Sequence, residues 1–124
     1  MTTKILLVDD SATVLMMERM ILATERFEIV TASNGEEAQE KAQSEQPDLI
    51  LMDVVMPRMN GIQACKALRQ HPATQHIPII LVTTRGETET MEQGYASGCN
   101  DYVTKPVNSA ELLGKIRNIL GAAK

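Results

Sequence analysis

Short aliphatic runs of strand length recur along the chain and alternate with longer segments of helical pattern. Two of the runs, 49–52 and 79–82, do not alternate with polar residues, which is typical of strands buried on both faces of a parallel sheet. The expected strands are 5–8, 27–31, 49–52, 77–82 and, more weakly, 102–103. This pattern predicts a parallel sheet covered by helices on both sides.

Helical segments fill the intervals between these runs. The first helix is expected at 11–24 and the fourth at 87–96, and the other three are each preceded by an asparagine with N-cap chemistry. These asparagines are Asn34, Asn60 and Asn108. Glu37 is placed to close a capping box with the first of them. Five strand–helix units in succession predict an α/β fold, a doubly wound (βα)5 sandwich with right-handed crossovers.

The first predicted helix is apolar nearly all round. Val14, Met17 and Ile21 are expected to face the sheet. Met16 and Met20 then point elsewhere, and we expect them to pack against the last helix. The alternative is a soft docking patch for a partner protein, because methionine suits adaptable surfaces.

The fourth predicted helix has few apolar anchors. Only Met91 and Tyr95 are sizeable, and Gly94 weakens the helix further. Few buried contacts mean low local stability, which is typical of an element that moves.

The composition indicates one globular domain with an aliphatic core. The 124 residues are 44% apolar, with one Phe, two Tyr and no Trp. The net charge is −4 and no basic run is present, which disfavours direct nucleic-acid binding.

No apolar run reaches membrane-spanning length and no signal-peptide pattern is visible, so we expect a cytoplasmic protein without membrane insertion. Cys65 and Cys99 match no metal or redox spacing and are expected to be reduced thiols.

Polar residues interrupt the apolar runs at the ends of four strands. Asp9 and Asp10 follow the first strand, Asp53 the third, Thr83 the fourth and Lys105 the fifth. Each alone has a structural explanation, such as a helix cap, a strand end or a solvated charge. Ligands of open parallel sheets bind at the carboxyl ends of the strands, where these five residues are expected to meet. Together they predict a functional site.

The chemistry of such a site follows from its charges. Three converging carboxylates repel one another, so a cation must offset them. Mg²⁺ suits oxygen ligands, and Lys105 adds a compact positive charge that can reach a phosphate. An aspartate can attack phosphorus and form an aspartyl-phosphate, and Asp53, which stands alone after the central strand, is the better nucleophile. Thr83 can donate its hydroxyl to the phosphoryl group.

Four motifs resemble those of response regulator receiver domains. They are the Asp9-Asp10 pair after an apolar strand, LMDVVMPRMNG at 51–61, VTT at 82–84 and YVTKP at 102–106. The resemblance runs from Lys4 to about Leu120 and implies a single receiver domain over 1–124. It also implies a flavodoxin-like sheet of strand order 2-1-3-4-5. Within the family the chain is most similar to single-domain receivers of chemotaxis or twitching-motility type.

Carried over residue by residue, the resemblance implies a magnesium site built around the phosphate acceptor. Asp53 is then the acceptor, and Asp9, Asp10 and Asp53 hold Mg²⁺, with Mn²⁺ as an acceptable substitute. The backbone carbonyl of Val55 completes this ligand set. Arg85, together with the Val55 side chain, is expected to tune the lifetime of the phosphate.

The resemblance also implies how the phosphate is read. Thr83 and Lys105 contact the phosphoryl oxygens, and Tyr102 changes rotamer on activation. The Lys105–Pro106 peptide bond is expected to be cis. Output is then expected through the face made by the fourth helix, the fifth strand and the fifth helix.

The implied partners are proteins. A histidine kinase or a histidine phosphotransfer protein would supply the phosphate, and a downstream protein would bind the altered face. Because the chain ends soon after the fifth helix, we expect output by protein contact, by passing the phosphate on, or by draining it as a sink. We expect a monomer or weak dimer whose only catalysis is on itself, unless the chain is one domain of a longer protein.

Three other functions are less consistent with the sequence. A flavin-binding electron carrier needs a phosphate-cradling loop after the first strand, where Asp9 and Asp10 would repel phosphate. An aspartate-nucleophile phosphatase typically has a second Asp two residues after the nucleophile, where this chain has Val55. A receiver-like scaffold that works unphosphorylated is disfavoured by the complete set of site residues.

Overall fold

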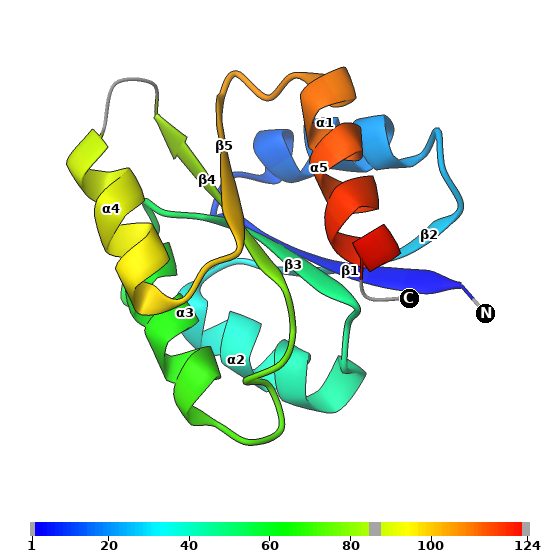
Figure 1. Ribbon diagram of the computed structural model, residues 1–124. Coiled ribbons are helices and arrows are strands. Elements are labelled where there is room, and N and C mark those ends of the chain that lie inside the picture. The colour runs from blue at the N-terminus through cyan, green and yellow to red at the C-terminus, as the bar shows by residue number, and fades with distance from the viewer. Residues whose placement is uncertain (1, 85–87, 123–124) are drawn as a thin grey trace.

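The structure is a computed structural model that describes residues 2–84 and 88–122. A five-stranded sheet lies between two layers of helices, with α1 and α5 on one face and α2, α3 and α4 on the other (Figure 1). The elements in chain order are β1 (Thr3–Val8), α1 (Ala12–Leu22), β2 (Phe27–Ala32), α2 (Gly35–Glu45), β3 (Leu49–Asp53), α3 (Gly61–Gln70), β4 (Ile79–Thr84), α4 (Thr88–Ser97), β5 (Asp101–Lys105) and α5 (Ser109–Ala122). All strand pairs are parallel and the order is β2-β1-β3-β4-β5, which confirms the predicted doubly wound fold.

Successive residues of each central strand enter two different cores. Ile5 and Leu7 of β1 pack on the side of α1 and α5, whereas Leu6 and Val8 pack on the side of α2 and α3. This is the side-chain alternation of a strand whose two faces are both covered. Cys65 and Cys99 are buried free thiols in the second of these cores, as expected for reduced cysteines.

The ends of the strands differ from the predicted ends for local reasons. β4 begins at Ile79 rather than at residue 77, because the N–H of Ile77 donates to the Thr74 carbonyl and Pro78 has no N–H to give to the sheet. β5 is longer than the two predicted residues because it pairs with β4 from Asp101 to Lys105.

The helix caps follow the predicted asparagines, with one correction. Asn34 accepts from the N–H of Glu37, but the Glu37 carboxylate accepts from Ser33 and not from the N–H of Asn34. The predicted capping box is therefore only half formed. The complete box lies at Asn60, whose partner is Gln63.

The buried face of α1 was predicted correctly only in part. Ile21 packs against the core as expected. Met17 is 54% exposed and does not face the sheet, and Met16 and Met20 are exposed rather than packed against α5. The helix instead buries Leu22 and Glu18, with Leu15 packed against the same core. These positions form a helical stripe that is hard to see in the sequence, because its middle member is an acid.

Gly94, which was expected to weaken α4, has a packing role in the structure. This glycine is buried, and a Cβ added to it would lie 2.9 Å from the Leu81 side chain. Gly94 thus allows α4 to approach β4 closely. Tyr95 is exposed rather than buried, and the side chain of Met91 lies outside the described residues.

Candidate functional site

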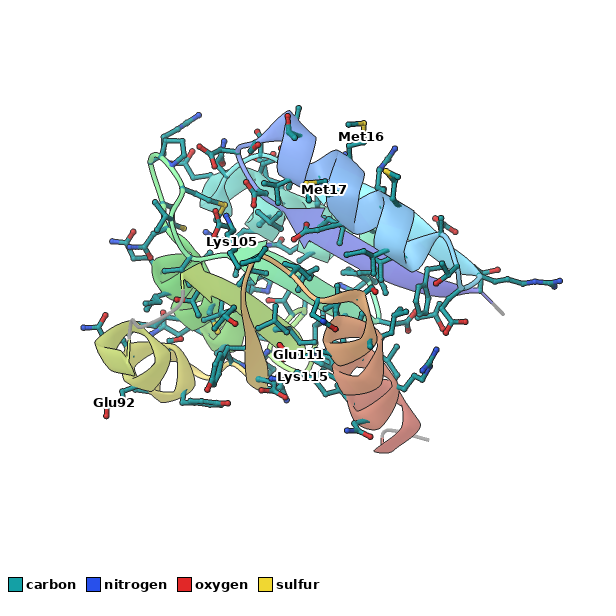
Figure 2. The ribbon with its side chains drawn as sticks, turned by 90° about the horizontal axis from the view of Figure 1, so that it is seen from above. Met16, Met17, Glu92, Lys105, Glu111 and Lys115 are labelled. Carbon is teal, nitrogen blue, oxygen red and sulfur yellow. The ribbon has the colours of Figure 1, made fainter. Side chains whose placement is uncertain are left out.

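Four of the predicted site residues meet at the carboxyl edge of the sheet. Lys105 Nζ lies 3.2 Å from Asp53 Oδ2 and 3.6 Å from Asp9 Oδ2, so one ammonium bridges the ends of β1, β3 and β5. Asp10 also reaches this group, because one oxygen of each of the three aspartates lies within 4.8 Å of the others. Figure 2 shows Lys105 at the end of β5, in the middle of this edge.

Asp9 is held by the start of α1. Its N–H donates to the Ala32 carbonyl of β2, and its Oδ1 accepts from the N–H of Ser11, the N-cap of α1. Oδ2 is then left for the ion pair with Lys105, and it has no hydrogen-bond partner within residues 2–84 and 88–122. A buried carboxylate oxygen without a hydrogen bond is costly unless a cation lies beside it.

Asp53 is positioned by the backbone on both sides of it. The next residue, Val54, donates its N–H to Val82 of β4 and accepts from the N–H of Gly61. A Cβ at Gly61 would lie 2.3 Å from the Asp53 carbonyl oxygen, so only glycine allows the loop to return this close. Asp53 therefore lies between a strand pair and the first turn of α3.

Among the described residues, three carboxylates of the site share one ammonium, so their negative charge is not fully balanced. Burial, and then the nearby Asp9, raise the pKa of Asp53, while Lys105 opposes the rise. Burial lowers the pKa of Lys105, but Asp53 and Asp9 together outweigh it and raise that pKa above its usual value. The ammonium thus stays charged, and the site can still gain from a further cation.

The aspartates fit a hard divalent cation. They offer three carboxylates within ligand distance of one another, of which Asp9 and Asp53 are buried and Asp10 is exposed. Asp9 Oδ2 accepts no hydrogen bond among the described residues, so it is available as a ligand for an ion. The side chain of Val55 is 66% exposed and has no polar atom, so only its carbonyl can contribute. Oxygen donors of this kind, completed by water, suit Mg²⁺ and Mn²⁺.

The predicted switch residues lie on the two neighbouring strands. Thr83 of β4 is buried, and its register partner on β5 is Thr104. Tyr102 is partly buried and packs against the core on the α3 side. The Lys105–Pro106 peptide bond is cis, as predicted. Arg85, the other residue expected near the phosphate, lies outside the described residues.

Sequence reasoning missed Glu18, a buried acid behind the site. Its side chain lines a small apolar cavity of about 100 Å³ between α1 and the segment after β5, together with Lys105 and Pro106. Burial, and then Asp9, raise its pKa to about 8, and its Oε1 has no hydrogen-bond partner among the described residues. The only signal in the sequence was the spacing of 15, 18 and 22, which an acid interrupts.

A larger hollow lies away from these residues. It measures about 370 Å³ and is lined by residues such as Pro47, His76 and Pro78 beside the opposite ends of the strands. We place the site at the acids nevertheless, because an ion and a phosphoryl group need charged ligands more than volume.

Comparison with known proteins assigns the chain to a family. Residues 5–117 match the family model described as the response regulator receiver domain. The chain is 39% identical over 124 residues to the phosphate regulon transcriptional regulatory protein PhoB of Rhizobium meliloti. That alignment covers 100% of this chain and 55% of the relative, so the chain spans about half the length of the curated protein it matches.

Solved structures show the same similarity. Chemotaxis response regulator CheY4 of Vibrio cholerae superposes with a TM-score of 0.88 at 34% identity, covering 96% of this chain and 99% of that one. The receiver domain of sensor histidine kinase PA1611 from Pseudomonas aeruginosa superposes with a TM-score of 0.90 at 27% identity, covering 98% and 99%. That structure has a magnesium ion coordinated in its active-site cleft. Among the described residues, no helix is long and apolar enough to cross a membrane.

Proposed function

Because the chain belongs to the response regulator receiver domain family, we propose that Asp53 accepts a phosphoryl group from a phosphohistidine on a histidine kinase or phosphotransfer protein. Receiver domains are signalling phosphoacceptors rather than classical enzymes. The observation that carries the assignment to Asp53 is its position: it lies 3.2 Å from the Lys105 ammonium, beside Asp9 and Asp10.

The residues have distinct roles in the proposed transfer. A carboxylate oxygen of Asp53 attacks phosphorus, the new O–P bond forms, and the N–P bond breaks with its electron pair returning to the imidazole of the donor. The Lys105 ammonium and the Thr83 hydroxyl neutralise and orient the phosphoryl oxygens. Hydrolysis by water returns the carboxylate and releases inorganic phosphate.

Asp9, Asp10, Asp53 and the Val55 carbonyl are the proposed ligands of Mg²⁺, for which Mn²⁺ would substitute. When bound, the ion would supply positive charge to the transferring phosphoryl group. The fit of the residues supports this assignment, since three oxygen donors lie within 4.8 Å of one another.

Phosphorylation is proposed to act on the α4-β5-α5 face. The phosphoryl group would draw the Thr83 hydroxyl toward the site, and Tyr102 would then move toward the space beside it. This is a population shift, which the phosphate drives only through contacts that differ between the two states. A downstream protein would read the altered face.

The exposed methionines of α1 are the proposed docking surface for the phosphate donor. Met16, Met17 and Met20 are all more than half exposed, and Figure 2 shows Met16 and Met17 on α1, above Lys105 in that view. Flexible apolar side chains beside the acceptor suit a helical partner.

Several finer points remain part of the proposal. We propose that residues 1–124 form one receiver domain, and that the protein is a cytoplasmic monomer or weak dimer that makes no direct contact with nucleic acid. A role in chemotaxis or twitching motility stays a prediction, because the chain is similar both to a chemotaxis regulator and to transcriptional regulators.

Intact mass spectrometry tests the acceptor. The protein is incubated with acetyl phosphate and Mg²⁺, as wild type, as Asp53→Asn, and as Asp48→Asn, a control on an exposed aspartate outside the site. We expect wild type and the control to gain one phosphoryl group and Asp53→Asn to gain none, because Asn cannot attack phosphorus as a carboxylate does. No gain in any of the three would favour the unphosphorylated scaffold.

A further inference from the structure

Tyr102 is contacted from two sides by residues of the neighbouring helices. Lys115 of α5 has its ammonium 4.9 Å from the centre of the Tyr102 ring, and Figure 2 shows Lys115 on α5 beside β5. Tyr95 of α4 meets the same ring in an edge-to-face arrangement, with centroids 5.8 Å apart at 80°. Both contacts are favourable, and both would change if the Tyr102 ring took another position.

One carboxylate oxygen joins these residues into a network. Asp101 Oδ1 accepts from Tyr95 Oη at 3.3 Å, from the N–H of Tyr102 at 2.8 Å and from Lys115 Nζ at 3.2 Å. Lys115 also donates to the Tyr102 carbonyl. Donors from α4, β5 and α5 therefore converge on a single atom. Burial and Asp101 raise the pKa of Tyr95 to about 12, so its hydroxyl remains a donor at neutral pH.

The network matters because it links α4 to β5. Among its described side chains, 92–97, only Gly94 is buried. Tyr95 is 48% exposed, yet it supplies both the ring contact to Tyr102 and the hydrogen bond to Asp101. A displacement of either the ring or α4 would thus break the same contacts.

We propose that Lys115 and Tyr95 are positioning residues that clamp Tyr102 in its unphosphorylated orientation, so that α5 and α4 set the threshold for switching. The clamp rests on the proposed function in one respect, that Tyr102 is the switch residue. Phosphorylation at Asp53 then has to overcome the ring contacts and the Asp101 hydrogen bonds before the α4-β5-α5 face changes.

The chain has only two tyrosines, which makes the clamp measurable by ¹⁹F NMR of protein containing 3-fluorotyrosine. Tyr95→Phe removes one resonance and so assigns the other to Tyr102. The comparison is made without phosphate between wild type, Lys115→Gln and Lys66→Gln. Lys66 is an exposed lysine of α3 with no role in the network, so its variant controls for the loss of one charge.

We expect Lys115→Gln to shift the ratio of Tyr102 ring positions roughly two- to fivefold, the change expected for losing a cation–ring contact at a partly exposed site. The shift should go toward the Tyr102 resonance of wild type phosphorylated with acetyl phosphate, and Lys66→Gln should match wild type. A Tyr102 resonance in Lys115→Gln that superposes on wild type overturns the clamp. Failure of Asp53 to take up phosphate would instead sink the proposed function and leave this phosphate-free comparison valid.

Discussion

At the scale of single residues, the same carboxyl group behaves differently according to what faces it. Asp53 has the Lys105 ammonium 3.2 Å away, and Asp101 accepts three hydrogen bonds through one oxygen. Glu18 is as buried as Asp53 but has an oxygen without any hydrogen bond among the described residues. Its environment therefore favours the neutral acid.

This burial predicts a dependence of stability on pH. Burial, and then Asp9, raise the pKa of Glu18 from 4.5 to about 8. Between those pH values the folded chain binds a proton at Glu18 that the unfolded chain releases, so its contribution to stability is lost as pH rises. The loss is on the order of a few kcal/mol, since each pKa unit corresponds to about 1.4 kcal/mol.

Chemical denaturation from pH 5 to 8.5, without divalent cations, measures the effect. We expect wild type to lose stability relative to Glu18→Gln as pH rises, because Gln has nearly the same shape and cannot ionise. The other carboxyl groups are present in both proteins, so the difference between the two curves isolates Glu18. If the free energies of unfolding of the two proteins changed in parallel with pH, Glu18 would be ionised, or would relax, without a cost in stability.

At the scale of elements, the loop from β3 to α3 positions Asp53 by close backbone packing. The N–H of Gly61 bonds the Val54 carbonyl at 2.9 Å, and Asn60 and Gln63 fix the start of α3 with a complete capping box. A methyl group at Gly61 would overlap the Asp53 carbonyl oxygen. The close approach of α3 to the end of β3 at Asp53 therefore requires a glycine at position 61.

Gly61→Ala tests this packing. We expect a loss of ~1–3 kcal/mol in the free energy of unfolding, as for other overpacked sites, and a slower gain of phosphate at Asp53 because its backbone must shift. Gly114→Ala is the matched control. Nothing lies within 4 Å of a Cβ at Gly114 in α5, so this change should stabilise the protein by about 0.5–1 kcal/mol.

Denaturant unfolding and the mass assay with acetyl phosphate give both readouts on the same variants. If Gly61→Ala were as stable as Gly114→Ala and equally phosphorylated, the loop would not position Asp53.

At the scale of the whole molecule, the proposed input and output surfaces lie on different elements. The exposed methionines lie on α1, whereas the clamp on Tyr102 joins α4, β5 and α5. The amino-terminal ends of β4 and β5 are fastened separately by Arg69 of α3, which donates to the carbonyls of Ile77 and Gly98 and to Asn100. These bonds tie that end of the sheet to α3, away from the acidic group.

Because the two surfaces are separate, changes to the α1 methionines should slow phosphotransfer from a kinase but not phosphorylation by acetyl phosphate. In Met16→Ser/Met20→Ser, phosphorylation by a histidine kinase that acts on wild type should slow roughly tenfold or more, since fully burying one methionine is worth ~1.5–3 kcal/mol. Phosphorylation by acetyl phosphate should be unchanged, because neither methionine lines the acidic group. Lys66→Ser, on exposed α3 surface, serves as the control. Equal slowing with both phosphate donors would place the defect in the site rather than in docking.

The sequence alone determined the parts of this protein that repeat or lie next to one another in the chain. Apolar runs specified five strands and their buried faces, since a strand covered on both sides admits few polar residues. Polar residues at the strand ends specified the acidic edge, since parallel strands end at one side of the sheet. The resemblance of the motifs added the cis peptide bond and the strand order, which the structure confirms.

Only the tertiary structure decided which face of α1 is buried and which side chains meet across elements. A prediction from apolar periodicity places apolar residues on the buried face, so it included Met17 and left out Glu18. The burial of Glu18 depends on the neighbouring segment that contains Lys105. The convergence of Tyr95, Lys115 and Asp101 around Tyr102 was equally invisible, because it depends on how far α4 and α5 stand from β5. Those distances arise from packing many residues at once, and no local pattern in the chain encodes them.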